Sequence, residues 1–426
     1  MSSNYRFETL CLHHGQQPDP STRARAVPVY RSSSFVFDST EQAARLFSLE
    51  EKGNIYSRIM NPTNAILEER MAALEGGQAA LALASGTTAV YYAIINICTP
   101  GDEVVSSVNL YGGTHTMFDS ILSQIGITTR FVDPRKPEQF AEQISGKTRA
   151  LYLESIGNPT LEIPDIEAVA AVARKHHLPL IVDATFTTPY LLQCFRHGAD
   201  IVIHSLTKWI GGHGTAIGGI VVDSGQFDWT DPKFRLFNEP DPGYHDLKFA
   251  HDFGNDSQLA FSTRLRLVPL RNLGACLSPD NAWIFLQGLE TLSLRMDRHC
   301  SNALRVAEFL ETHPKVSWVR YPGLKSDPSH TTARKYLHRG FGGMVVFGIA
   351  GGKQAGAYFI DRLQLFSHLA NVGDAKSLAL HPGSTTHSQL NEEQQVAAGI
   401  SPEMIRLSIG LEHPEDILAD LAQALS

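Results

Sequence analysis

ALYLESIGNPTLEIPDIEAVAAVARKHHLPLIVD, residues 150–183, contains the pattern that decides the fold. It begins with one short apolar run, ALYLE, and ends with another, PLIVD. Between these runs, Ile166, Val169 and Val172 recur at intervals of three, with acidic residues before them and basic residues after them. That spacing and charge distribution predict a helix over residues 164–177. The stretch therefore predicts two strands joined by a helix.

The same alternation continues on both sides of this stretch. Further apolar runs rich in Val and Ile occupy residues 103–108, 127–132, 200–204 and 218–223. Strands of this kind, separated by helices, form parallel sheets whose two faces are covered by helices. The predicted fold class is α/β, with a mostly parallel central sheet.

A smaller unit is predicted after the sheet. Ser278 suits the N-cap of a long helix, and Pro279 suits its first position. Strands are expected near residues 343–349 and 404–409. The predicted organisation is a lead segment at residues 1–60, a large domain at 61–278 and a small domain at 279–426. The apolar residues with helical spacing at the start of the small domain are Trp283, Leu286, Leu289 and Leu292.

The composition argues against several classes of protein. The 426 residues are 43% hydrophobic, and 36 Lys and Arg against 44 Asp and Glu give a net charge of −8. Scattered basic residues at this balance argue against binding to nucleic acid or anionic membranes. The five cysteines include no Cys-x-x-Cys pair, which argues against a metal site and a disulfide framework. With no signal-peptide pattern and no apolar run near the roughly 18–20 residues that span a bilayer, a soluble, cytoplasmic protein is expected.

Two residues whose side chains could take part in catalysis directly follow predicted strands, at the edge where open parallel sheets bind ligands. Asp183 ends the run LIVD, and a carboxylate at the end of a buried strand needs a cationic partner. A helix cap or a loop salt bridge is the alternative for Asp183. Lys208, in HSLTKWIGGHG, has apolar and glycine neighbours that favour its neutral, nucleophilic form. A solvated surface lysine is the alternative for Lys208.

Three further features complete a candidate cofactor site. Gly86 and Thr87 would present N–H groups at a helix N-terminus, which binds anions, although SGTT is also an ordinary helix start. Ser205 and Thr207 add hydroxyl donors beside Lys208. Tyr111, directly after a strand, suits stacking on a flat ring or filling the sheet edge. A lysine, a carboxylate, an anion site and an aromatic ring together fit pyridoxal 5'-phosphate (PLP).

These motifs are similar, over nearly the whole chain, to those of the Cys/Met-metabolism family of PLP enzymes, the cystathionine synthase and lyase group. The resemblance implies an aspartate aminotransferase-like fold of type I. HSLTKWIGGHG matches the family's cofactor-lysine motif, which implies a Schiff base between PLP and Lys208. YSRIMNPT (56–63) matches the segment with which Tyr56 and Arg58 reach the phosphate site of a neighbouring subunit. The resemblance therefore favours an arm over a loosely structured surface for residues 1–60, and implies a homo-oligomer, usually a tetramer.

The resemblance also implies roles for the other site residues. Asn158, in ESIGNPT, lies near the 3-oxygen of the cofactor and, with Tyr56, near the substrate. Arg406, in IRLSIGLE, holds the substrate carboxylate, which suits a guanidinium that forms two bonds, and Ser377 flanks it. The residues implied at the phosphate and ring of the cofactor are Ser85, Gly86, Thr87, Tyr111, Asp183, Thr185, Ser205 and Thr207.

Within the family the chain is most similar to O-acetylhomoserine sulfhydrylases. The shared features are GHGTAIGG, an insertion with EPDPGYH and LRNLGACLSPDNA, and LFSHLANVGDAKSLALHPGSTTHSQL. Gly113 stands where methionine γ-lyases carry cysteine, and Ala184 stands where most relatives have asparagine.

The reaction implied is replacement of acetate in O-acetyl-L-homoserine by sulfide, which gives L-homocysteine. In it Lys208 is the general base at the α-carbon, Asp183 keeps the ring nitrogen protonated, and Tyr111 assists proton transfer at the leaving group. Use of O-succinylhomoserine, a cystathionine γ-synthase activity and a methionine γ-lyase activity are alternatives. A binding protein that has kept the fold but lost catalysis is the alternative outside enzymes.

Overall fold

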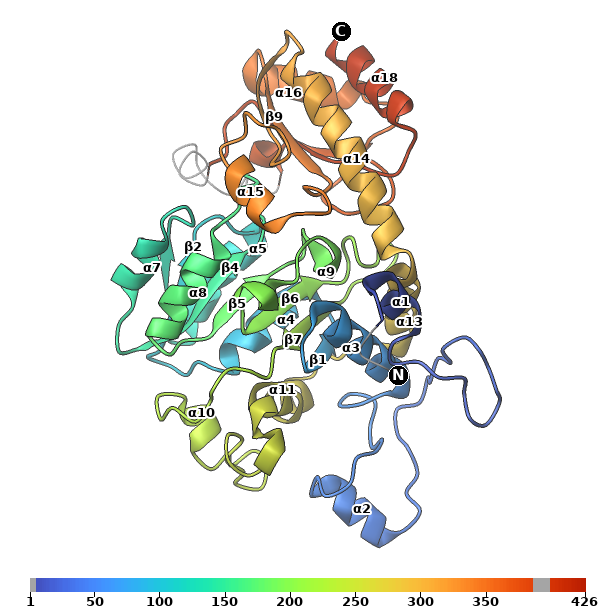
Figure 1. Cartoon of the computed structure of the whole chain (residues 1–426), viewed down its shortest axis with the longest axis vertical. Helices are drawn as coiled ribbons and strands as arrows, with labels where there is room; N and C mark the ends of the chain where they lie inside the picture. The colour runs from blue at the N-terminus through green and yellow to red at the C-terminus, as the bar shows by residue number, and fades with distance from the viewer. Residues whose placement is uncertain (1–4, 386–398) are drawn as a thin grey trace.

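The computed structural model describes residues 5–385 and 399–426, which are arranged around two β-sheets (Figure 1). The larger sheet has seven strands in the order β1-β7-β6-β5-β4-β2-β3. β7 runs antiparallel to β1 and β6, and the remaining neighbours are parallel. The predicted mostly parallel sheet is confirmed. Its strands are β1 (Ala79–Leu83), β2 (Glu103–Ser107), β3 (Thr128–Val132), β4 (Thr148–Glu154), β5 (Leu180–Asp183), β6 (Ile201–Ser205) and β7 (Gly219–Asp223).

Strand β1 is the one member of this sheet that the sequence pattern missed. Its residues, AALAL, lack the β-branched side chains that mark the other strands. It is held by antiparallel pairing with β7 from Ala79 to Leu83. Tertiary contact, rather than local propensity, makes this segment a strand.

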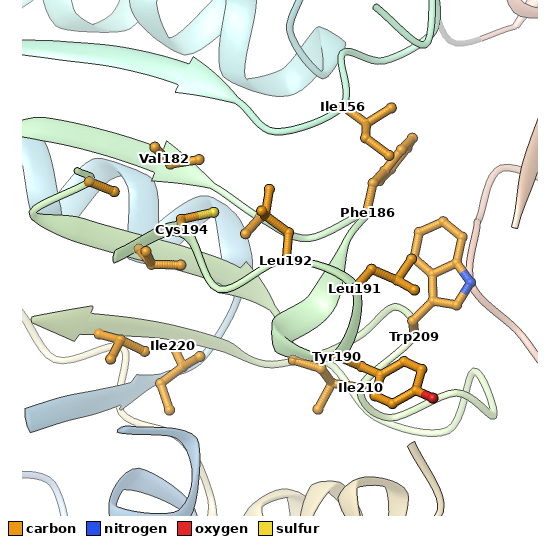
Figure 2. Close-up of a cluster of buried hydrophobic side chains, with 14 of the residues drawn as sticks. Ile156, Val182, Phe186, Tyr190, Leu191, Leu192, Cys194, Trp209, Ile210 and Ile220 are labelled. Carbon is orange, nitrogen blue, oxygen red and sulfur yellow. The ribbon is translucent and has the colours of Figure 1, made fainter. Parts of the chain in front are cut away.

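Both faces of the large sheet are buried. Leu180 and Val182 of β5 belong to one hydrophobic cluster, whereas Ile181 belongs to a second cluster on the opposite face. Figure 2 shows part of the first cluster, where the rings of Phe186 and Trp209 meet edge-on with centroids 5.1 Å apart. Helices contribute to both clusters, as predicted. The first includes α1 (Phe7–His13), α3 (Pro62–Glu75), α8 (Ile166–Lys175) and α13 (Pro279–Glu290), and the second includes α4 (Gly86–Ile95) and α11 (Ala260–Leu265).

Side-chain hydrogen bonds cap α8 and α13, although α8 begins at Ile166, two residues after the predicted start. The Asp165 carboxylate accepts from the backbone N of Ala168 at 3.1 Å, which caps α8. The Ser278 hydroxyl accepts from the backbone N of Asn281 at 3.1 Å, and Pro279 begins α13.

The expected single long helix after Ser278 is wrong, because the chain leaves helical geometry at Thr291. The ψ of Thr291 is 10°, and α14 (Leu292–Glu311) begins at the next residue. The buried guanidinium of Arg295 in α14 donates to the carbonyl of Gly288 at 2.6 Å. A side chain thus satisfies a carbonyl that the end of α13 leaves without a helical partner.

The small sheet has five strands in the order β10-β11-β12-β9-β8, and the two strands expected there are confirmed as β9 and β12. α14 packs on β8 and β9, whereas α13 packs on α1 and α3. We therefore propose that the large domain extends to residue 290, further than the predicted boundary at 278. The strands are β8 (Val316–Arg320), β9 (Met344–Ile349), β10 (Ser367–His368), β11 (Leu378–Leu380) and β12 (Met404–Ser408), covered by α14, α16 (Gly352–Arg362) and α18 (Pro414–Leu425).

The segment between α1 and α3 leaves the body of the molecule and carries α2 (Thr40–Phe47) at its far end (Figure 1). Over residues 5–385 and 399–426, no helix combines the length and apolarity needed to cross a bilayer. The short connecting helices are α5 (Gly112–Thr116), η1 (Met117–Ile121), α6 (Leu122–Gln124), α7 (Pro137–Gln143), α9 (Thr188–Leu191), η2 (Cys194–His197), α10 (Arg235–Asn238), η3 (Gly254–Leu259), η4 (Arg266–Leu270), α12 (Arg271–Leu273), α15 (His330–Tyr336) and η5 (Pro382–Ser384).

Candidate active site

A cavity of about 970 Å³ lies where β4, β5 and β6 end. This is the edge at which parallel sheets bind ligands, because polar groups at the carboxyl ends of the strands meet there. Arg406 of β12 closes the cavity from the small sheet. The predicted site residues that line it are Ser85, Gly86, Thr87, Tyr111, Asn158, Asp183, Thr185, Ser205, Thr207, Lys208 and Arg406.

Lys208 lies in this cavity just beyond β6. Its Nζ donates to Oδ1 of Asn371 at 2.6 Å. Burial, and then the positive charge of Arg406, lowers the pKa of Lys208 to about 8. About a tenth of this amine is therefore neutral at pH 7, far more than for an ordinary lysine, and able to attack a carbonyl.

Asp183 ends β5 and is tied to the strand beside it. One carboxylate oxygen, Oδ1, accepts from the backbone N of Thr185 at 2.9 Å, and the Thr185 hydroxyl accepts from the backbone N of Ser205 at 2.8 Å. Burial raises the pKa of Asp183. A cation in the cavity beside Asp183 would favour the charged form of its carboxylate. A protonated ring nitrogen would be such a cation.

The N-terminus of α4 lies against the end of β6. The Ser85 hydroxyl caps α4 by accepting from the backbone N of Thr88 at 3.0 Å. A Cβ at Gly86 would lie 2.6 Å from Cβ of Ser205, so only glycine allows this close approach. The N–H groups at the start of α4 and the Ser205 hydroxyl therefore line one end of the cavity, as an anion site requires. The Thr207 hydroxyl, by contrast, accepts from the backbone N of Gly218 at 3.1 Å.

Tyr111 stands at the N-cap of α5, and its position depends on two neighbours. Its backbone N donates to Oε1 of Glu154 at 2.7 Å. A Cβ at Gly113 would lie 2.6 Å from Cε1 of the Tyr111 ring, so a side chain there would displace the ring. Tyr111 is 49% exposed, which leaves its ring free to stack on a flat ligand.

Arg406 and Asn158 both line the cavity and are hydrogen-bonded to each other. Nη1 of Arg406 donates to Oδ1 of Asn158 at 3.1 Å, and burial lowers the pKa of Arg406 to about 10. This hydrogen bond orients the guanidinium without neutralising its charge. The other N–H groups of a guanidinium stay available for an anion such as a carboxylate.

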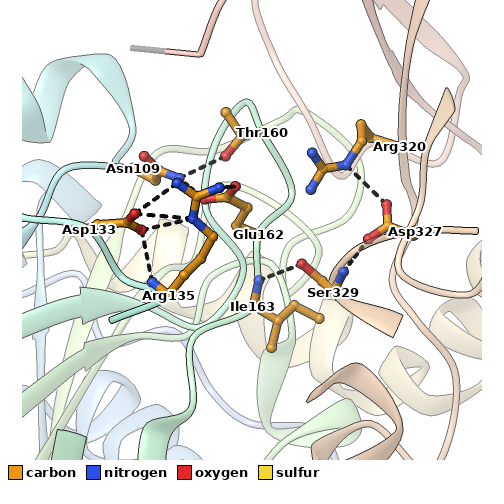
Figure 3. Close-up of polar contacts among 9 residues, drawn as sticks. All are labelled: Asn109, Asp133, Arg135, Thr160, Glu162, Ile163, Arg320, Asp327 and Ser329. Carbon is orange, nitrogen blue, oxygen red and sulfur yellow. Dashed lines mark hydrogen bonds and ion pairs between the residues drawn. The ribbon is translucent and has the colours of Figure 1, made fainter. Parts of the chain in front are cut away.

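Polar contacts hold residues 160–163, which follow Asn158 in the chain (Figure 3). The Asn109 amide donates to the Thr160 hydroxyl at 3.2 Å and also to the Glu162 carboxylate. The backbone N of Ile163 donates to the hydroxyl of Ser329, at 3.3 Å, which joins the loop to the second half of the chain. Contacts on both sides therefore fix the segment that follows Asn158.

Three predicted site residues do not line this cavity. Ser377 is fully buried, and its hydroxyl donates to Oε2 of Glu412 at 2.9 Å and accepts from the backbone N of Gly410 at 2.9 Å. Tyr56 and Arg58 lie in the segment that leaves the body, where the Arg58 guanidinium stands 5.3 Å from the centre of the Tyr56 ring.

Glu154 and Asn371 line the cavity and bond to predicted site residues, but they were not themselves among the predicted site residues. Glu154 ends the run ALYLE just as Asp183 ends LIVD, so the same signal was present. Burial, and then the charge of Asp183, raises the pKa of Glu154 well above its ordinary value. Asn371 lies inside the quoted segment LANVGDAKS, but no local feature distinguishes it. Across residues 5–385 and 399–426, no group of His, Cys, Asp and Glu side chains could hold a metal ion.

The residues of the cavity fit PLP. The aldehyde needs a neutral amine, the ring nitrogen a carboxylate, the ring face an aromatic side chain and the phosphate an anion site. Lys208, Asp183, Tyr111 and the N-terminus of α4 supply these four groups within one cavity.

Comparison with known proteins agrees with this chemistry. The model of the Cys/Met metabolism PLP-dependent enzyme family matches residues 8–426. An O-acetyl-L-homoserine sulfhydrylase of Leptospira meyeri is 54% identical, over 100% of this chain and 98% of its own. A homocysteine synthase of Schizosaccharomyces pombe is 51% identical, over 98% of each chain.

A crystal structure from Campylobacter jejuni, of a protein assigned as an O-acetylhomoserine (thiol)-lyase, is similar over 99% of this chain and 100% of its own. The TM-score is 0.95, the sequence identity is 42%, and the structure contains N'-pyridoxyl-lysine-5'-monophosphate. The chain therefore belongs to the Cys/Met metabolism PLP-dependent enzyme family.

Proposed function

We propose that the chain is a PLP-dependent O-acetyl-L-homoserine sulfhydrylase, which replaces acetate by sulfide to give L-homocysteine. The observation that carries this proposal is the single cavity in which the Lys208 amine, of lowered pKa, lies near the buried guanidinium of Arg406. The two relatives of highest identity reported above bear the names of this activity and of its product.

Within the cavity each wall has a separate task in holding the cofactor. Lys208 carries PLP covalently, Asp183 keeps the ring nitrogen protonated, and Tyr111 stacks on the ring. The N–H groups of Gly86 and Thr87 and the Ser205 hydroxyl hold the phosphate, with Ser85, Thr185 and Thr207 supporting them. When bound, PLP acts as the electron sink for carbanion chemistry at the substrate.

Arg406 binds the substrate carboxylate through its free N–H groups, and Asn158 fixes the plane of the guanidinium. The Lys208 amine removes the proton from the α-carbon, for which a pKa near the working pH is suited. Asn371 accepts a hydrogen bond from this amine and so directs it. Tyr111 moves a proton at the acetate leaving group.

The active oligomer is proposed to share its sites between subunits. Arg58 and Tyr56 of one subunit bind the cofactor phosphate of a neighbour, and Tyr56 also faces the neighbour's substrate. In support, the segment that carries them stands away from its own body (Figure 1) and exposes apolar side chains, with Val36 98% exposed. A homotetramer built from such dimers is the assembly we propose.

The proposal is tested with purified protein, added PLP and O-acetylhomoserine, with and without sulfide. Homocysteine that forms only with sulfide supports it. Ammonia and 2-oxobutanoate without sulfide would instead identify a γ-lyase, and product formation only from the O-succinyl ester would overturn the acetyl donor. Cystathionine formed from added cysteine in preference to homocysteine would identify a cystathionine γ-synthase.

A further inference from the structure

The insertion between β7 and α13, residues 224–278, contacts the segment that carries Tyr56 and Arg58. Because α1 packs on the body, we call residues 14–61, which follow α1, the arm in place of the predicted 1–60. The insertion is anchored to the body, because the buried guanidinium of Arg264 donates to Oδ1 of Asn96 at 3.0 Å and to Asp241 at 3.3 Å. Hydrogen bonds also join the insertion to the arm. Tyr244 Oη donates to the carbonyl of Phe47 at 3.0 Å, and Arg266 Nη1 donates to the carbonyl of Ile59 at 2.6 Å. In the other direction, Arg58 Nη1 of the arm donates to the carbonyl of Arg271.

Arg266 connects the arm to the large sheet. While Nη1 donates to the carbonyl of Ile59, Nη2 donates to Oε2 of Glu68 at 2.6 Å. The other oxygen of Glu68, Oε1, accepts from the backbone N of Ala82 in β1 at 2.9 Å. A continuous series of hydrogen bonds therefore runs from β1 through Glu68 and Arg266 to the arm. Two of its bonds are charge-assisted and part-buried, which makes them stronger than neutral ones.

The carbonyl that Arg266 binds belongs to the turn that contains the phosphate-binding residues of the proposed function. The backbone N groups of Ile59 and Met60 both donate to the carbonyl of Tyr56, at 3.0 and 3.1 Å. Fixing Ile59 therefore fixes the direction in which the residues from Tyr56 to Ile59 leave the body. Arg58 lies inside this turn.

We propose that Arg266 is a positioning residue, which holds the turn at Tyr56–Ile59 so that Arg58 enters the cofactor phosphate site of a second copy of this chain. This inference rests on the proposed role of Arg58. Arg266 itself contacts a carbonyl and a carboxylate of its own chain, so it acts through Arg58 and not on the cofactor.

The test is a double-mutant cycle on the full-length enzyme. Apoenzymes of wild type, Arg266→Gln, Arg58→Ala and the double variant are titrated with PLP, and oligomer mass is measured by light scattering. Arg266→Gln is expected to weaken PLP binding about tenfold at unchanged oligomer mass, the size of effect that loss of a charge-assisted hydrogen bond produces. In the double variant PLP binding should be no weaker than in Arg58→Ala alone, because Arg266 acts through Arg58.

Two further variants keep the test decisive if Arg266→Gln folds poorly. Arg266→Lys retains the positive charge beside Glu68 but lacks the planar pair of donors. Its affinity for PLP is therefore expected to lie between the affinities of wild type and Arg266→Gln. Arg235→Gln, in an exposed ion pair of the same insertion with Glu239, should leave PLP binding unchanged.

The outcomes separate this inference from the proposed function. Unchanged PLP binding in Arg58→Ala would overturn the shared phosphate site itself. Weaker binding in Arg58→Ala but not in Arg266→Gln or Arg266→Lys would overturn only the role of Arg266. Additive losses in the double variant, or a lower oligomer mass in Arg266→Gln, would show that Arg266 acts on the fold or assembly and not through Arg58.

Discussion

The cavity and the arm hold their functional side chains in opposite ways. In the cavity, Lys208, Asp183 and Arg406 each form a hydrogen bond inside their own chain, and burial shifts the pKa of all three. On the arm, Tyr56 is 41% exposed, and Arg58 bonds to a single backbone carbonyl. This difference supports the proposal that the arm serves the site of a neighbouring subunit, whereas the cavity residues are positioned by contacts within their own chain.

The largest effect is expected when the Lys208 amine is removed from the cavity. Lys208→Ala loses both the covalent attachment of PLP and the base at the α-carbon. We expect kcat for homocysteine formation to fall at least about a thousandfold, and the visible absorbance of the bound cofactor to change. Turnover close to wild type would contradict the role of Lys208.

Arg406→Gln should raise the KM for O-acetylhomoserine about a hundredfold, because the substrate carboxylate loses a buried charged partner. Arg406→Lys keeps the charge without the planar fork, so a smaller increase is expected. Steady-state kinetics with varied O-acetylhomoserine measure both. An unchanged KM in the glutamine variant would place the carboxylate elsewhere.

The pKa of Lys208 can be tested in the apoenzyme. Because the pKa is lowered to about 8, the neutral amine is scarce below that pH and predominates above it. The rate of covalent PLP incorporation should therefore rise about tenfold from pH 7 to about pH 9 and then level off. In Arg406→Gln the midpoint should move to higher pH, since the Arg406 charge contributes to the lowered pKa. A pH-independent rate would contradict the assignment.

Oligomers mixed from two variants test whether the cavity of one subunit works with the arm of another. Lys208→Ala subunits have an intact arm, and Arg58→Ala subunits have an intact cavity. After dissociation and equal mixing, about a quarter of the sites should combine both intact parts. Activity is measured at a PLP concentration that leaves Arg58→Ala alone mostly without cofactor, and it should exceed the sum of the separate proteins. No gain on mixing would mean that each chain completes its own site.

The smallest effect is expected at Gly113. A Cβ there would press on the Tyr111 ring, which can move because it is half-exposed. We expect Gly113→Ala to lower kcat by roughly threefold to tenfold with little change in PLP affinity. The kcat of Gly146→Ala is a matched control, because a Cβ at that glycine meets no atom within 4 Å.

The sequence motifs predicted the fold class, the family and the cofactor, and the comparisons confirm these. The side chains at strand ends were predictable because carboxyl ends of parallel strands share one edge, which is how Asp183 was identified. Glu154 carried the same signal and was still missed. Ser377 matched a motif beside Arg406, yet it does not line the cavity, and its hydroxyl accepts from the backbone N of Gly410.

What the sequence determined by itself is local: the apolar periods of the strands and α8, the cap at Ser278, and the motif around Lys208. These follow from side-chain pattern and backbone preference within a few residues. Only the tertiary structure decided the break at Thr291, the pairing of β1 and the lowered pKa of Lys208. Each depends on contacts between residues that are distant in the sequence, and these contacts form only in the folded chain. Arg295 bonds to the end of α13, β7 pairs with β1, and burial lowers the pKa of Lys208.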